Sequence, residues 1–167
     1  TLLNIICTII PKVIEGILDV SVKIDNEEIR DLPLNRIAQR ISLMMQEPDR
    51  QIVLPNVEME LAFAPENLCL TQSEINDRIL ETVELLNLRS LLKQETHKLS
   101  YGQKKLTTFA SLITLSPFFF LLDEPAAGLA SQSIDLLRFA IQHLKKQKKG
   151  FIITDHTDTL SDLADST

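Results

Sequence analysis

The sequence predicts an α/β fold built on a parallel sheet, with an α-helical segment inserted between two of its strands. Short apolar runs at 41–45, 118–122 and 151–154 have the length and composition of buried strands. Segments with apolar residues at helical spacing separate these runs. The chain has 167 residues, 44% of them apolar and 24% charged. A chain of this size can bury about 70% of its unfolded surface and form a core without disulfides or metals.

The first ten residues are expected to form a buried helix rather than the remnant of a signal peptide. No basic residue precedes this apolar segment and no small-residue cleavage site follows it. The apolar residues that helical spacing places on one face are Leu2, Ile5, Ile6 and Ile9. Alternating apolar and polar residues over 17–24 then predict a half-buried strand.

The middle of the chain is expected to be an all-helical insert. Polar residues end the first apolar run, and helical spacing then extends over 57–92. Pro55 and Pro65 are expected to break the helices of this segment. Thr71 and Glu74 have the spacing of a capping box, which predicts that a helix starts at Thr71.

The second half of the chain predicts a helix, a strand, a helix and a strand. Ser100 and Gln103 form a second capping box, and the helix that they begin should end before Pro117. Gly150 is expected to cap the second of the two helices. In chain order, the elements after Pro117 are a strand at 118–122, a helix at 131–148 and a strand at 151–154.

Polar residues follow each of the three predicted strands. Gln46 follows the first, Asp123 and Glu124 the second, and Asp155 and His156 the third. Since the carboxyl ends of parallel strands meet at one edge, and ligands bind there, these side chains are expected to share a site.

Charge and cysteine content exclude several other classes of function. Seventeen Lys and Arg against 23 Asp and Glu give a net charge of −6, which argues against a nucleic-acid partner. Cys7 and Cys69 lack the CxxC spacing of a metal site, and reduced thiols in a cytoplasmic protein explain them most simply. No apolar stretch approaches the length of about 18 residues that a membrane span needs.

Five motifs in a fixed order resemble those of the ATP-binding subunits of ABC transporters. Leu99-Ser-Tyr-Gly-Gln103 is similar to the signature motif and Leu121-Leu-Asp-Glu-Pro125 to Walker B. Gln46 matches the Q-loop glutamine, Ala127-Gly-Leu-Ala130 the D-loop, and His156 the switch histidine. The resemblance covers essentially the whole chain. It implies a P-loop NTPase-like parallel sheet core with an inserted helical signature subdomain.

A finer resemblance is to the energy-coupling-factor branch, which includes cobalt-type importers and takes up vitamins and transition-metal ions. Gln46-Glu-Pro-Asp-Arg-Gln-Ile52, Val57-Glu-Met-Glu60 and Ala62-Phe-Ala-Pro-Glu-Asn67 are similar to the extended Q-loop of that branch and to the helix after it. This resemblance implies an ATPase subunit that powers such an importer from the cytoplasmic face of the cell membrane. Its expected partners are transmembrane transport subunits and a second ATPase subunit.

The resemblance implies ATP and Mg²⁺ as ligands and assigns roles to residues at the sheet edge. Asp123 and Gln46 would hold Mg²⁺, and Gln46 would also reach the attacking water. Glu124 would be the general base that polarises this water. His156 would contact the γ-phosphate.

The signature motif is expected to act on a second subunit. Ser100, Gly102 and Gln103 stand at a helix N-terminus, where backbone N–H groups and the helix dipole favour an anion. The resemblance implies that this anion is ATP bound to the opposite subunit of a head-to-tail homodimer or heterodimer. Thr1 is expected to bind the chain's own ATP, because it resembles the residue directly after the Walker A Lys-Ser.

Some features depart from the family pattern. No two of the four glycines have the spacing of the Walker A loop, so the printed sequence is expected to start just after the Walker A lysine, to stop before the next strand, and to bind ATP poorly. Tyr101 replaces a signature glycine, which should be tolerated if its side chain points away from the phosphate. Ala130 replaces the usual D-loop Asp, which weakens the expected coupling between two ATP sites. One incomplete ABC ATPase domain is expected, with the Q-loop core at 1–55, the helical subdomain at 56–99, and the remaining motifs at 100–167.

Two alternatives belong to other functional classes: an ABC ATPase of DNA repair, chromosome structure or translation, and an ABC module that does not hydrolyse ATP. ABC ATPases of DNA repair and chromosome structure carry long coiled coils between Q-loop and signature, whereas only 53 residues separate Gln46 from Ser100. Translation-factor ABC proteins usually have Asn-His-Leu-Asp after the Walker B proline, and this chain has Ala126-Ala-Gly-Leu-Ala130. A degenerate, non-hydrolysing ABC module is favoured by Ala130 and the missing loop, but opposed by Glu124 and His156.

Overall fold

The structure is a computed structural model that describes residues 2–7, 21–24 and 27–165. Its helices are α1 (Leu2–Ile6), α3 (Leu34–Ala38), α4 (Val57–Asn67), α5 (Gln72–Leu85), α6 (Tyr101–Leu115) and α7 (Ser131–Lys146). Its strands are β1 (Lys23–Ile24), β2 (Glu27–Glu28), β3 (Ile41–Met44), β4 (Phe119–Asp123) and β5 (Gly150–Thr154). None of the helices in the described part of the chain has the length and apolar character needed to cross a membrane.

The central sheet confirms the predicted α/β class. Strands β3, β4 and β5 lie side by side in that order, and both pairs are parallel. Their register aligns Ser42 with Phe120 and Phe120 with Phe151. All three apolar runs of the sequence therefore form neighbouring strands, whose carboxyl ends lie at the same edge. A separate short pair, β1 and β2, is antiparallel.

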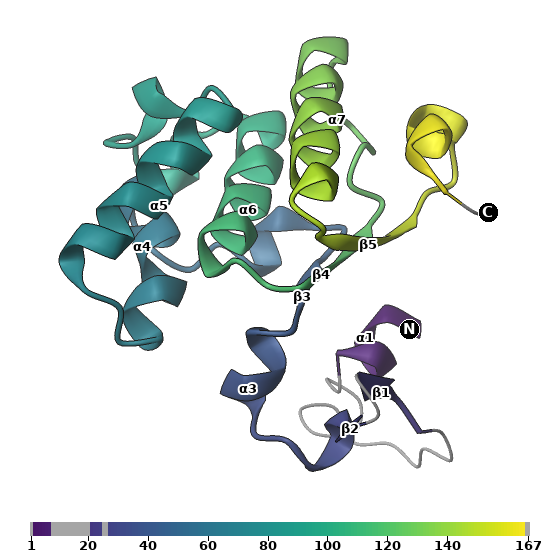
Figure 1. Cartoon of the computed structure of the whole chain (residues 1–167). Helices are drawn as coiled ribbons and strands as arrows, with labels where there is room; N and C mark the ends of the chain where they lie inside the picture. Colours follow the sequence, from purple (N-terminus) through teal and green to yellow (C-terminus); the bar gives the residue numbers. More distant parts are fainter. Residues whose placement is uncertain (1, 8–20, 25–26, 166–167) are drawn as a thin grey trace.

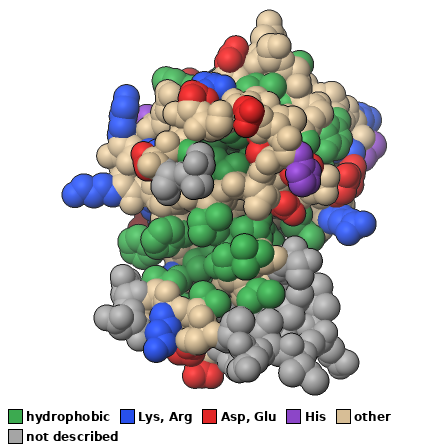
Figure 2. Space-filling model, turned by 90° about the vertical axis from the view of Figure 1, so that its right-hand side faces the viewer, with side chains coloured by type: hydrophobic (Ala, Val, Ile, Leu, Met, Phe, Trp, Pro, Cys, Tyr) green, Lys and Arg blue, Asp and Glu red, His purple; other side chains and the backbone are tan. Residues whose placement is uncertain are grey.

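The two faces of the sheet are covered by different parts of the chain. Helices α4 to α7 lie on one side, and α1, α3, β1 and β2 lie on the other (Figure 1). Phe120 faces the helical side, where its ring packs edge-to-face on Phe109 and stacks on Phe151. Leu121 faces the opposite side and clusters with Leu3 of α1. In the space-filling view, hydrophobic side chains form a band between these two parts (Figure 2).

The predicted helical insert is confirmed, but Pro65 does not break it. Pro65 lies inside α4, which continues to Asn67. A proline has no N–H for the carbonyl four residues earlier, which here belongs to Leu61. The hydroxyl of Thr114 on α6 donates to that Leu61 oxygen at 2.9 Å. Because a neighbouring helix satisfies the freed carbonyl, α4 can continue through the proline.

Both predicted capping boxes are present. The hydroxyl of Thr71 accepts from the Glu74 amide, and the Glu74 carboxylate accepts from the Thr71 amide. Ser100 and Gln103 make the equivalent pair of bonds at the start of α6. Each box satisfies backbone donors that the first turn of a helix leaves without a partner.

Replacing Thr71 by Ala should lower the free energy of unfolding by about 1 kcal/mol, because the amide of Glu74 loses its side-chain acceptor. Urea denaturation followed by circular dichroism measures this change. The matched control is Ser73→Ala, an exposed position in the same first turn, which should change the value by less than about 0.5 kcal/mol. Equal effects of the two substitutions would contradict a specific role for the cap.

The buried face of the first helix differs from the expected one. Leu2 is 65% exposed, while Leu3 and Cys7 are buried against the sheet. Burial also raises the pKa of the Cys7 thiol to about 12. Ile9 and most of the predicted strand at 17–24 lie outside the described residues, and within that segment β1 covers only Lys23–Ile24.

Gly150 is the first residue of β5, not the cap of the preceding helix. Helix α7 ends with Gln147 as its C-cap, and Lys148 takes the left-handed conformation with φ of 63°. A Cβ atom on Gly150 would lie 2.3 Å from the ring of Phe119. The glycine is therefore required by the close approach of a side chain on the neighbouring strand.

Candidate functional site

Three of the predicted site residues meet at the carboxyl edge of the sheet. The amide of Gln46, which follows β3, donates to the Glu124 carboxylate over 2.9 Å. Nε2 of His156, which follows β5, lies 2.8 Å from the other carboxylate oxygen of Glu124. The parallel register brings the ends of β3 and β5 to either side of β4, so Glu124 stands between the other two side chains.

Glu124 is held in an unusual backbone conformation at this edge. Its φ is 47°, in the left-handed region that residues other than glycine rarely adopt. The amide of Glu124 donates to the carbonyl of Thr154 over 2.9 Å, so the residue is anchored to the end of β5. Its side chain is only 16% exposed, whereas that of His156 is 88% exposed. The carboxylate is thus partly shielded, and the imidazole is open to a ligand.

Asp123 is the last residue of β4 and is fixed by its neighbour on β5. The hydroxyl of Thr154 donates to one Asp123 carboxylate oxygen over 2.7 Å. The carboxylate of Asp123 and the amide oxygen of Gln46 are hard ligands of the kind that Mg²⁺ prefers. Within the described ranges, no cluster of three or more His, Cys, Asp or Glu could enclose a metal. Two oxygen ligands of this kind fit Mg²⁺ that keeps several waters and is shared with substrate phosphates.

The loop that carries Gln46 is shaped by two further side chains. Gln51 folds back on β3, accepting from the amide of Met45 and donating to a strand carbonyl, each over 2.7 Å. The buried carboxylate of Glu60 on α4 accepts from the amides of residues 53 and 54. Both ends of the loop are anchored, one to the sheet and one to the helical layer. Gln51 and Glu60 belong to the extended motif of the sequence, but their contacts were not predicted.

The signature residues do not join the cluster around Glu124. Ser100 and Gln103 bond each other in the capping box, and no hydrogen bond between Ser100 and Glu124 is present in the part of the chain that the structure describes. Gly102 follows Ser100 in the first turn of α6. The fourth predicted ATP-binding residue, Thr1, lies outside the described residues.

The side chain of Tyr101 folds back onto its own chain. Its hydroxyl lies 3.5 Å from the carbonyl oxygen of Gln46, and its ring covers Gly128, where a Cβ atom would come within 2.8 Å of it. Gly128 also has a φ of 74°. Both this left-handed backbone and the close approach of the Tyr101 ring favour glycine at the position. Tyr101 thereby joins the start of α6 to the loops after β3 and β4.

Two other residues of this region have features that the sequence did not predict. Lys105 is completely buried, and burial lowers the pKa of its ammonium group. Its burial is not evident from the sequence, because a lysine in an amphipathic helix is normally exposed. Ala130 is the N-cap of α7 and makes no side-chain cap. The Asp usual at this position could have capped the helix.

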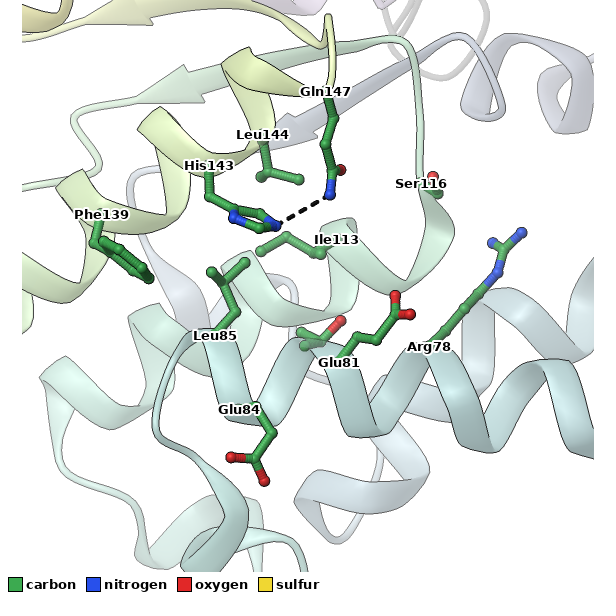
Figure 3. A pocket seen from close by; sticks show the side chains of 11 residues that line it. Arg78, Glu81, Glu84, Leu85, Ile113, Ser116, Phe139, His143, Leu144 and Gln147 are labelled. Atoms are coloured by element: carbon green, nitrogen blue, oxygen red, sulfur yellow. Dashed lines mark hydrogen bonds between the residues drawn. The ribbon is translucent and has the colours of Figure 1, made fainter.

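A groove of about 620 Å³ lies apart from these residues, between α5, α6 and α7 (Figure 3). Arg78 and Glu81 of α5 and Phe139 and His143 of α7 line its sides. None of the predicted site residues that the structure describes lines this groove. The candidate site is therefore the sheet edge around Glu124.

Comparison with known proteins agrees with the motifs. The ABC transporter family model matches residues 1–127. The chain is 32% identical to the energy-coupling factor transporter ATP-binding protein EcfA of Methanoculleus marisnigri over 86% of the chain and 53% of that protein. It is 31% identical to a putative ABC transporter ATP-binding protein of Methanosarcina mazei over 93% of the chain and 27% of that protein. The chain thus spans about half or less of these curated relatives.

The structure also resembles that of cbiO1 from Clostridium perfringens, which is described as part of the ABC transporter complex cbiONQ. The TM-score is 0.75 at 27% sequence identity, and the match covers 89% of this chain and 61% of the other.

Proposed function

This chain belongs to the ABC transporter family, and we propose that it is part of an ATP-hydrolysing subunit that powers an importer of the energy-coupling-factor type. The names of the relatives EcfA and cbiO1 support this branch. A vitamin or a transition-metal ion would then be the cargo. The membrane subunits of the importer would select that cargo, and the ATPase would lie at the cytoplasmic face of the membrane without crossing it.

One observation carries the proposal that the site hydrolyses ATP. The Glu124 carboxylate is held between the Gln46 amide and the His156 ring. Hydrolysis requires a base for the attacking water and groups that stabilise charge on the γ-phosphate, and both kinds of group are present here. A module that only binds nucleotide would not need a carboxylate at this position.

Glu124 would accept a proton from water as the water oxygen attacks the γ-phosphorus and the bond to the ADP oxygen breaks. Gln46 would orient the same water through its side-chain amide. His156 would donate to a γ-phosphate oxygen, for which its exposure suits it. In the present arrangement, Gln46 and His156 both contact Glu124 itself, so water and phosphate would take the place of these contacts.

Asp123 and Gln46 would hold Mg²⁺, Asp123 through bound water. When bound, Mg²⁺ supplies positive charge that neutralises the phosphates during transfer. Thr154 contacts one oxygen of the Asp123 carboxylate, and the second oxygen would face such a hydrated ion.

We further propose that Ser100, Gly102 and Gln103 bind ATP held by a second subunit. Helix α6 has 15 residues, and its amino end combines first-turn N–H groups, of which the capping box already uses that of Gln103, with a dipole that favours phosphate. Among the described residues, Ser100 bonds Gln103 and not Glu124, which supports a role in the opposite site of a head-to-tail dimer. Thr1 would contact the chain's own ATP.

The remaining motifs complete the proposal for the whole protein. We divide the chain into the Q-loop core at 1–55, the helical subdomain at 56–99 and the segment 100–167 with the other motifs. The same dimer would bind transmembrane transport subunits, and the net charge of −6 argues against nucleic acid as a partner. Ala130 in the D-loop favours weak coupling between the two ATP sites.

In the full-length protein, Ser100→Arg should lower turnover at saturating ATP at least about tenfold, while ATP affinity changes less than about twofold. A bulky side chain at the amino end of α6 would block the approach of the partner's phosphate. Phosphate release and equilibrium nucleotide binding measure the two quantities. The matched control is Thr71→Ala, which also removes a cap but lies on α5. A similar loss of turnover in that control would mean that the effect is only structural.

Mixed dimers test whether Ser100 acts on the partner's site. When Ser100→Arg is on one subunit and the loss of the Walker A lysine is on the other, both lesions fall in one composite site. The second site stays whole, so activity should survive. When both lesions are on one subunit, each site carries one lesion and activity should disappear. Equal activity of the two mixed dimers would overturn the assignment.

A further inference from the structure

The side chain of Lys105 joins the signature helix to the turn that carries Glu124. Lysines are almost never fully buried unless their charge is paired, yet Lys105 on α6 has no exposed surface. Its neighbour Lys104 instead reaches the surface carboxylate of Asp49. Burying a charged ammonium group costs free energy unless hydrogen bonds compensate for the lost water. The contacts of this group therefore matter for its role.

The Lys105 ammonium group contacts backbone carbonyls, not a carboxylate. It donates to the carbonyl oxygen of Glu124 and, over 2.9 Å, to that of Ala127. It also lies 5.7 Å from the ring centroid of Tyr101, on the same helix. Two carbonyls and an aromatic face are the partners of its three N–H groups.

These two carbonyls lie at the two ends of the turn 124–127. Within this turn, the Ala127 amide donates to the Glu124 oxygen over 3.2 Å. Among the described residues, the other backbone bond at Glu124 runs from its amide to the carbonyl of Thr154. A left-handed backbone at a glutamate persists only when the surroundings fix it. Lys105 supplies a bond at each end of the turn and thus fixes this conformation from the helical side.

We propose that Lys105 is a positioning residue, which holds the backbone at Glu124 so that the carboxylate meets Gln46 and His156. Its importance for turnover rests on the proposed function of Glu124, but its effect on the turn does not. The same side chain connects the helix that begins at Ser100 with the base of the chain's own site. Displacement of α6 would therefore be transmitted to Glu124.

Amide hydrogen exchange in the full-length protein tests this inference. In Lys105→Met, which keeps the length of the side chain and removes the amine, amide exchange at Glu124 and at residues 126–128 should become at least about tenfold faster relative to the amides of α5. Lys105→Gln, which keeps N–H donors, should restore part of the protection. The matched control is Lys93→Met, because Lys93 is 82% exposed and pairs with Glu58 at the surface. It should leave exchange in the turn unchanged.

A second measurement does not depend on any variant. In the unsubstituted protein, the ammonium protons of Lys105 should exchange with water at least about tenfold more slowly than those of Lys93, as nitrogen-detected NMR would show. The inference is overturned if the two lysines exchange alike. It is also overturned if Lys105→Met leaves the turn protected, or accelerates exchange in α5 by the same factor.

An activity measurement separates this inference from the proposed function. Lys105→Met should lower kcat at least about tenfold with KM for ATP within about twofold, and Lys105→Gln should recover part of kcat. If exchange in the turn becomes faster but kcat is unchanged, Glu124 is not the base, and the proposal that Lys105 holds the turn is still supported. If exchange in the turn is unchanged, Lys105 does not hold the turn. The role of Glu124 as base is then tested separately by Glu124→Gln.

Discussion

Replacing Glu124 by Gln in the full-length protein is expected to reduce steady-state ATP hydrolysis by about 10²- to 10³-fold while Mg-ATP still binds. Glutamine has the shape of glutamate but cannot accept a proton from water. It can also preserve the contact with the Gln46 amide, because its own side-chain oxygen can accept that hydrogen bond. Phosphate release at saturating Mg-ATP measures hydrolysis, and equilibrium titration measures binding. ATP that is bound but not hydrolysed should keep the dimer closed.

The matched control for this prediction is Glu66→Gln, the same substitution at an exposed position of α4. It should leave hydrolysis unchanged within about twofold, because a surface substitution far from the sheet edge seldom matters. Unfolding by urea should be similar in the two variants. Hydrolysis by Glu124→Gln within a few-fold of the unsubstituted protein would show that Glu124 is not the base.

Replacing Phe120 by Ala should lower the free energy of unfolding by about 3–5 kcal/mol. Phe120 is fully buried in the central strand β4, where its ring centroid lies 6.0 Å from that of Phe109 and 5.0 Å from that of Phe151. Truncation would remove both aromatic contacts and leave a cavity between the sheet and α6. Urea denaturation measures the loss.

Phe118→Ala is the matched control, because Phe118 immediately precedes β4 and is 64% exposed. The ammonium group of Lys149 lies 5.5 Å from its ring centroid, an exposed contact of about 0.5–1 kcal/mol. The control should therefore cost no more than about 1 kcal/mol. Equal losses in the two variants would mean that Phe120 does not occupy the core as described.

Much of the fold could be predicted because it depends on local patterns. Continuous apolar runs identified β3, β4 and β5, and capping boxes at Thr71 and Ser100 marked the starts of α5 and α6. A parallel arrangement follows from the alternation of strands and helices, and it implies that the residues after the strands share an edge. The cluster of Gln46, Glu124 and His156 is a consequence of that topology.

Two predictions from local sequence were wrong because a side chain from a distant part of the chain contacts the segment concerned. Pro65 was expected to break a helix. The hydroxyl of Thr114 instead donates to the Leu61 carbonyl, which the proline leaves without its N–H donor. Gly150 was expected to cap a helix, but it is required by the Phe119 ring on the next strand. In both cases the deciding atom comes from residues more than 30 positions away in the chain.

The sequence by itself determined the order of the elements, the set of motifs and the edge of the sheet at which Gln46, Glu124 and His156 meet. Only the tertiary structure decided how Glu124 is held, with its left-handed backbone, its bond to Thr154 and the buried ammonium group of Lys105. Local patterns record which residues face a core, because periodicity follows from backbone geometry. They cannot record which carbonyl a buried lysine reaches, since that depends on how α6 packs over a turn 19 residues later in the chain.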